Sequence, residues 1–240
     1  LNLQKVISLI RAAAITVIAL MLAACSSDIS RARQLVEDSL AIKTDLEFQQ
    51  LKSYPGDIVC GSYSAYVSFS EPRQLNQPFI VVGDSLNKSP TARDEQFYCN
   101  DDQAAALHRD TGIGPFTKDS KELIKITADL TLINEALEAY YRDNYYYPTA
   151  AQGLQALVEQ PEVERQVGSY REGGYLEAIP RDPWNNAYLY EEEQWGRTKG
   201  SFTVTTLGQS AQPGGAGTEA DISTRVLPYL QHLARTLGVN

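Results

Sequence analysis

The chain has 240 residues, of which 43% are hydrophobic and 21% are charged, and its formal net charge is −9. This length allows one large domain or two small ones, and the apolar content favours a packed core over a disordered chain. A chain this acidic is a poor nucleic-acid binder, because phosphate contacts need clustered lysine and arginine.

The N-terminal segment is typical of an exported protein. Lys5 and Arg11 precede an apolar and small-residue run from 12 to 24, which is shorter than the ~20 residues of a bilayer span. The run ends in Leu-Ala-Ala-Cys, and this sequence resembles a bacterial lipobox. The resemblance implies a signal peptide over 1–24 and lipid attachment at Cys25, where several acyl chains would give durable anchoring.

Two other interpretations of this segment stay open, an uncleaved anchor and an ordinary signal peptide followed by a chance cysteine. Ser26 follows the lipidated position, and under enterobacterial sorting rules a serine there favours the outer membrane. We therefore expect a protein of the bacterial cell envelope that is lipid-anchored and faces the periplasm.

The remaining cysteines fit export. With Cys25 assigned to lipid, Cys60 and Cys99 form an even pair, which predicts a disulfide in an oxidising compartment. A zinc site is disfavoured, because His108 and His232 do not stand at ligand spacing from these cysteines.

Residues 25–102 are predicted to form a small α+β domain. A helix is expected from Arg31, within the stretch that ends at Tyr54. Three strands are expected, over 56–69, 77–84 and 95–101. The disulfide would then join the first strand to the last.

The Gly-Asp-Ser-Leu sequence at 83–86 resembles the nucleophile block of an esterase family, with Ser85 as nucleophile. Such a serine needs a histidine base oriented by a carboxylate. Neither histidine of this chain stands in the Asp-x-x-His block that the family uses. A strand followed by a turn is the favoured interpretation.

Residues 103–118, which contain Thr-Gly-Ile-Gly-Pro-Phe, are expected to link two domains. Asp119 and Glu122 stand at the spacing of a capping box, and a long helix is expected from there to about Tyr145, before Pro148. Apolar residues recur in this helix at spacings of three and four, which predicts one buried stripe.

From this helix onward the chain resembles the heads of G-type pseudopilins of type II secretion, over about 119–225. The shared positions run in order from the end of the helix to a Pro-x-Asp-Pro-Trp block: Tyr147, Pro148, Gly153, Leu154, Gly174, Tyr175, Pro180, Asp182, Pro183, Trp184 and Tyr188. The resemblance implies a pilin-like head in which a long helix packs on a small antiparallel sheet. The expected fold is therefore α+β, in two small domains.

These positions are interpreted as structural, and no catalytic residue is assigned. Asp182 is expected to accept hydrogen bonds from turn amides, and Trp184 to pack as an apolar plug on the long helix. Two strands should follow, at 187–195 and 201–208. Residues 226–240 are expected to form an amphipathic helix that covers the head.

The chain departs from the pseudopilin pattern in two ways. The family's prepilin leader is not seen, and a polar segment precedes the long helix instead. The closing loop of these heads binds calcium, and its ligands would correspond to Leu207, Ser210, Gly215 and Asp221. The family has an aspartate where this chain has Ser210, so weak or absent calcium binding is expected, unless Glu219 compensates.

The sequence therefore predicts a non-enzymatic envelope lipoprotein with a pseudopilin-like head. Its expected partners are the membrane, through the N-terminal lipid, and components of a secretion or pilus-like system. The alternative is a periplasm-facing lipoprotein binding module that is unrelated to secretion.

Overall fold

The computed structural model describes residues 27–162, 167–193 and 199–239. Cys25 and the expected signal peptide lie outside these residues. The chain divides into two compact units at the boundary between Gln103 and Ala104, and each unit is described by itself below. Within the described ranges, no helix combines the length and the hydropathy that crossing a bilayer requires.

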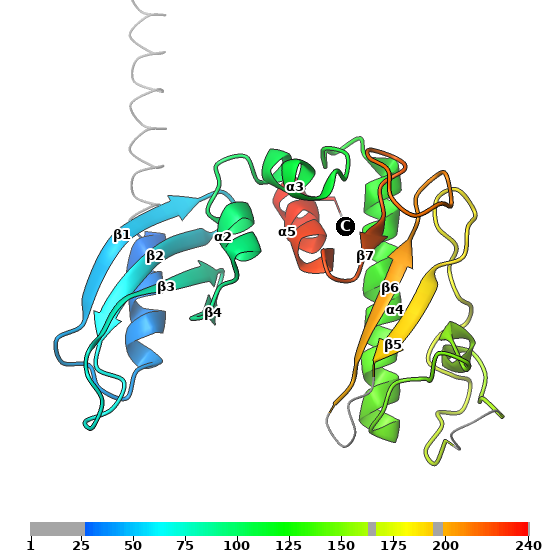
Figure 1. Cartoon of the computed structure of the whole chain (residues 1–240), viewed down its shortest axis with the longest axis horizontal. Coiled ribbons are helices and arrows are strands. Elements are labelled where there is room, and N and C mark those ends of the chain that lie inside the picture. The colour runs from blue at the N-terminus through cyan, green and yellow to red at the C-terminus, as the bar shows by residue number, and fades with distance from the viewer. Residues whose placement is uncertain (1–26, 163–166, 194–198, 240) are drawn as a thin grey trace, which may run out of the picture. The chain divides into compact units, whose positions relative to one another are not determined.

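The first unit is an antiparallel sheet with a helix against it (Figure 1). Helical residues 27–38 are followed by β1 (Glu47–Tyr54), β2 (Ile58–Ala65), β3 (Gln74–Val82) and β4 (Ser85–Asn87). The strands pair in sequence order, β1-β2-β3-β4. The helix is shorter than expected, and the residues that were expected to continue it form β1 instead.

The alternation of side chains along β2 and β3 gives this sheet two apolar faces. Val59, Tyr63 and Phe79 point to the face that packs on the N-terminal helix, through residues such as Val36. Ile58, Cys60 and Ile80 point to the opposite face, where Tyr98 and Cys99 pack against them. Both faces of a small sheet are thereby covered.

The third strand expected in this unit is wrong, because residues 92–98 form helix α2 (Ala92–Tyr98). Thr91 caps the helix by accepting a hydrogen bond from the Asp94 amide at 3.1 Å, and the Asp94 carboxylate accepts one from the Thr91 amide at 2.9 Å. This reciprocal pair satisfies two amides that a helix N-terminus would otherwise leave unpaired. Local capping therefore outweighed the β propensity of the Phe97–Cys99 run.

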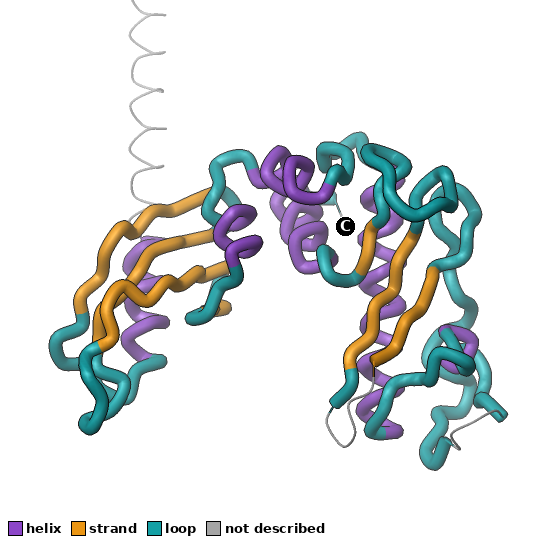
Figure 2. The backbone as a smooth tube through the Cα atoms, in the orientation of Figure 1, coloured by secondary structure: helices purple, strands orange, loops and turns teal. Residues whose placement is uncertain are grey.

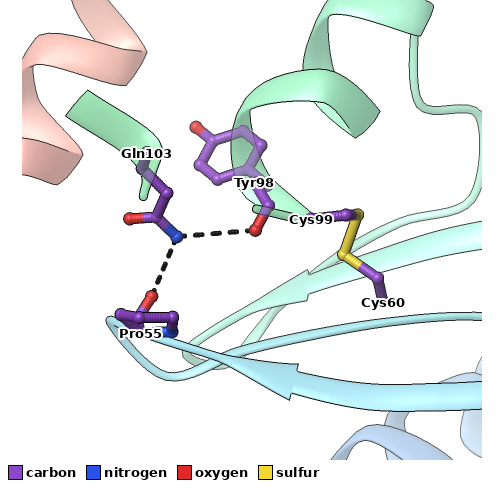
Figure 3. The surroundings of a disulfide bond; sticks show 5 residues. All are labelled: Pro55, Cys60, Tyr98, Cys99 and Gln103. Atoms are coloured by element: carbon purple, nitrogen blue, oxygen red, sulfur yellow. Dashed lines mark hydrogen bonds between the residues drawn. A yellow bond between two sulfur atoms is a disulfide. The ribbon is translucent and has the colours of Figure 1, made fainter. Parts of the chain in front are cut away.

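Cys60 and Cys99 form a disulfide with a Cα–Cα distance of 5.9 Å. It joins the central strand β2 to the C-terminus of α2, and not two strands as expected (Figure 3). Beside it, the Gln103 side-chain amide donates to the Pro55 carbonyl at 3.0 Å and to the Tyr98 carbonyl at 3.4 Å. The bond and the glutamine together fix the end of α2 to the sheet.

The second unit is a long helix against a small antiparallel sheet, as expected (Figure 2). Helix α3 (Gln103–Thr111) leads to α4 (Lys121–Asn144), a 3-10 turn η1 (Leu154–Leu157), and strands β5 (Leu189–Glu193), β6 (Ser201–Thr206) and β7 (Ile222–Ser223). The strands pair in the order β5-β6-β7. Helix α5 (Leu227–Leu237) packs against α4.

Two details at the start of this unit differ from expectation. The segment expected as a linker contains α3, whose Leu107 is buried. The predicted capping box is also wrong, because the N-cap of α4 is Ser120, and no side chain caps the helix there. The Ser120 hydroxyl instead donates to the Pro115 carbonyl at 3.2 Å and accepts from the Thr117 amide at 3.0 Å.

The apolar stripe of α4 is buried within its own unit. Ile126, Leu130, Ile133 and Leu137 are each fully buried at the spacing of three and four that the sequence shows. Tyr145 ends the helix in the left-handed conformation.

The disulfide should stabilise the first unit alone. Replacing Cys60 and Cys99 together by alanine should lower its free energy of unfolding by about 2–4 kcal/mol, since the bond closes a loop across a sequence separation of 39. Calorimetry of the mature protein should show this loss in one transition and leave that of residues 104–240 unchanged. Two free thiols in non-reducing peptide maps of periplasmic material would contradict the pairing.

Candidate functional site

The most connected polar group of the second unit is the Asp182 carboxylate, which is 3% exposed. Its Oδ1 atom accepts hydrogen bonds from the backbone amides of Trp184 at 3.0 Å and Asn186 at 2.7 Å. Its Oδ2 atom accepts from the Thr206 hydroxyl at 2.7 Å and from the Asn186 side-chain amide at 3.4 Å. The expectation that Asp182 organises a turn agrees with this geometry.

This network extends from the turn to the closing loop, residues 207–221. The Asn186 side-chain amide donates to the Gly208 carbonyl at 3.2 Å, and the Gly208 amide donates to the Thr206 hydroxyl at 3.2 Å. Thr206 is itself fully buried at the end of β6. One carboxylate therefore fixes the 182–186 turn, the end of β6 and the first residues of the loop.

A second buried carboxylate attaches the turn region to α4. Asp129 accepts a hydrogen bond from the Tyr188 hydroxyl at 2.8 Å and pairs with Lys125 at 2.6 Å. Lys125 also donates to the Arg181 carbonyl at 2.8 Å. Burial, reinforced by the adjacent Asp129, raises the pKa of Tyr188, so this hydroxyl stays protonated and donates.

The aromatic end of the head contains Tyr147, one of the shared positions. Its hydroxyl donates to Glu138 at 2.7 Å, and its ring packs against Phe202 with centroids 4.7 Å apart. Burial raises the pKa of Tyr147 to about 12. Nearby, the Tyr190 hydroxyl donates to the Pro148 carbonyl at 2.7 Å, which ties β5 to the chain that follows α4.

The glycine positions of the pattern have steric roles. A Cβ atom on Gly174 would lie 2.5 Å from the Val158 carbonyl oxygen and 2.9 Å from that of Leu157. The next two amides, of Tyr175 and Leu176, donate to the Leu157 carbonyl at 2.7 and 2.9 Å. Gly153 precedes Leu154 and the 3-10 turn with a φ of 59°. Both glycines therefore permit local backbone geometry that other residues would strain.

Trp184 is half-buried, together with its neighbours Pro180 and Pro183. Its packing on the long helix stays a prediction. The turn itself is fixed by hydrogen bonds to the Asp182 carboxylate. Thr206, which completes that network, was missed, because no local pattern marks a partner 24 residues away.

The expected calcium ligands form a poor set for a hard cation. The Ser210 hydroxyl is exposed and has hydrogen bonds to Gln212, at 3.5 and 3.4 Å. The Asp221 carboxylate already accepts the Gly214 amide at 2.9 Å. The described residues include no group of three or more acidic, histidine or cysteine side chains placed to hold a metal. Ca²⁺ sites take six to eight oxygens with several carboxylates, so the donors present do not fit this ion.

Ser85 and one surface groove are the remaining features to consider for chemistry or binding. Ser85 lies on β4, and the sequence of its unit contains no histidine. An open groove of about 680 Å³ lies between α4 and α5, and it is lined mainly by apolar and hydroxyl side chains, including Ile124, Leu132 and Ala234.

Asp182 should dominate the stability of the second unit. Asp182→Ala would leave buried donors unpaired and should lower the free energy of unfolding by about 3–5 kcal/mol. Asp119→Ala, at an exposed carboxylate on the same unit, should change it by less than about 0.5 kcal/mol. Urea unfolding monitored by tryptophan fluorescence measures both, and equal effects of the two substitutions would contradict the assigned role.

Comparisons with known proteins find relatives of the second unit. A profile of the family described as type II secretion system, protein G, matches residues 117–225. Type II secretion system core protein G of Vibrio cholerae is 43% identical over 105 residues, which cover 44% of this chain and 69% of that protein. The protein of the same name from Pseudomonas aeruginosa is 38% identical over 104 residues, covering 43% and 71%.

A solved structure is also similar. The major pseudopilin from the type 2 secretion system of enterohaemorrhagic Escherichia coli has 32% sequence identity and a TM-score of 0.38, covering 45% of this chain and 89% of that one. The region that the family profile matches, 117–225, contains the whole ordered set of positions from Tyr147 to Tyr188. Through this head, the chain belongs to the type II secretion system protein G family.

Proposed function

We propose that this chain is a non-enzymatic, lipid-anchored envelope protein that serves type II secretion as an accessory component. It would present a pseudopilin-type head to the secretion apparatus from a membrane surface. The observation that carries this proposal is the combination, in one chain, of a protein G family head with a lipobox-like sequence ending at Cys25. Family membership supports the secretion role, and the N-terminal sequence supports the anchor.

The residues before α4 support an accessory role. In the pseudopilins that this head resembles, the long helix continues from an apolar N-terminal segment that assembles the filament. Here α4 is preceded by the polar residues 117–120, by α3 and by a complete disulfide-bonded unit. The apolar stripe of α4 is already buried within its own head. Contact through the surface of the head therefore fits this chain better than assembly through its helix.

An envelope location follows from the same reasoning. A disulfide persists in oxidising compartments such as the periplasm. The expected lipid would hold the first unit at the membrane, with the outer membrane favoured by Ser26. The first unit has its own hydrophobic core, separate from the head. A separate domain of this kind also fits the alternative, in which the protein binds a ligand unrelated to secretion.

A complementation experiment tests this proposal. In a strain that lacks the gene, wild type should restore secretion, and a form truncated after Gln103 should not, although it keeps the anchor and the first unit. Labelled palmitate should enter the wild type and fail to enter Cys25→Ala. Undiminished secretion in the strain without the gene would favour the alternative function. Full secretion by the truncated form would exclude a role for the head, and equal labelling of both proteins would exclude the anchor.

A further inference from the structure

The strap, residues 112–116, runs between α3 and α4 and is fixed at both ends. At its start, the Gly112 amide donates to the His108 carbonyl at 2.8 Å, and the His108 Nδ1 atom lies 2.7 Å from the Ile113 carbonyl oxygen. At its end, the Pro115 carbonyl accepts the Ser120 hydroxyl at 3.2 Å. The strap is therefore a defined structure and not a loose connection.

The strap lies directly against the closing loop. The Gly217 amide donates to the Gly112 carbonyl at 2.8 Å, and Ile113 and Gly217 form a parallel bridge. The two backbones are adjacent at Gly114: a Cβ atom added there would be in van der Waals contact with the Gly217 Cα atom, at 3.7 Å. Two strap side chains, Ile113 and Phe116, are 1% and 3% exposed, so the strap is also anchored by buried apolar groups.

The closing loop needs support from outside itself. Gly214, Gly215 and Gly217 all have positive φ, and glycine loses more conformational entropy on ordering than any other residue. The loop's own polar contacts include a hydrogen bond from the Gln209 amide to the Thr218 carbonyl at 2.8 Å. Its only carboxylates are Glu219 and Asp221, and the latter already accepts the Gly214 amide.

We propose that the strap orders the closing loop, which is the role that a bound cation would otherwise have. The main-chain hydrogen bond between Gly112 and Gly217 fixes the loop to the strap, and the buried Ile113 and Phe116 fix the strap to the head. The loop has too few charged ligands for a cation to order it instead. The order of the loop is then independent of calcium. The folding unit of the head also begins at α3, before the matched region that starts at residue 117.

Hydrogen exchange in the mature full-length protein tests this role. In Ile113→Ala, amides of residues 208–220 should exchange at least about tenfold faster, because the cavity weakens the strap and the loop opens with it. Leu137→Ala is the matched control, since Leu137 is fully buried in α4 but remote from the strap in sequence. It should not raise loop exchange selectively. Ile113→Val should give the same pattern more weakly, which keeps the test valid if the alanine variant does not fold.

The wild type should show the same loop exchange in calcium and in chelator. Faster exchange of residues 208–220 on adding chelator would overturn the proposal, because a metal would then be holding the loop. Unchanged loop exchange in folded Ile113→Ala and Ile113→Val would overturn it as well. This readout does not depend on secretion, so it stands or fails separately from the proposed function.

Discussion

The head depends on the burial of one carboxylate. A buried carboxylate is costly unless hydrogen-bond donors surround it, and Asp182 receives donors from the 182–186 turn and from Thr206 on β6. Because these donors come from segments that are separate in sequence, the charge is stable only when the sheet and the turn are both in place. The same requirement gives the aspartate of the Pro-x-Asp-Pro-Trp pattern a structural role.

The other contacts of the head extend from this network. Tyr188, shortly after the turn, reaches Asp129 and so connects the sheet region to α4. The Asn186 side-chain amide donates to the Gly208 carbonyl and so positions the start of the closing loop. Later in the loop, the Gly217 amide donates to the Gly112 carbonyl. The result is a head whose helix stripe is buried inside it.

Sequence patterns predicted much of this architecture. Strands β2 and β3, the long helix, the two strands after the turn and the terminal helix follow from periodicity, and Asp182 follows from turn chemistry. Helix α2 was missed because the Thr91 and Asp94 cap decides a segment whose residues favour strands. The strap was missed because its main-chain bond to Gly217 spans more than a hundred residues, and main-chain bonds leave no side-chain signature.

We propose that this head acts from a membrane surface and is not a repeating subunit of a filament. The most direct measurement is the amount of this protein relative to core protein G in sheared, purified filaments from a strain with a complete secretion system. The protein should remain in the membrane fraction and should be far below subunit stoichiometry in the filaments. Regular incorporation along the filaments, at a constant ratio to the core subunit, would contradict it.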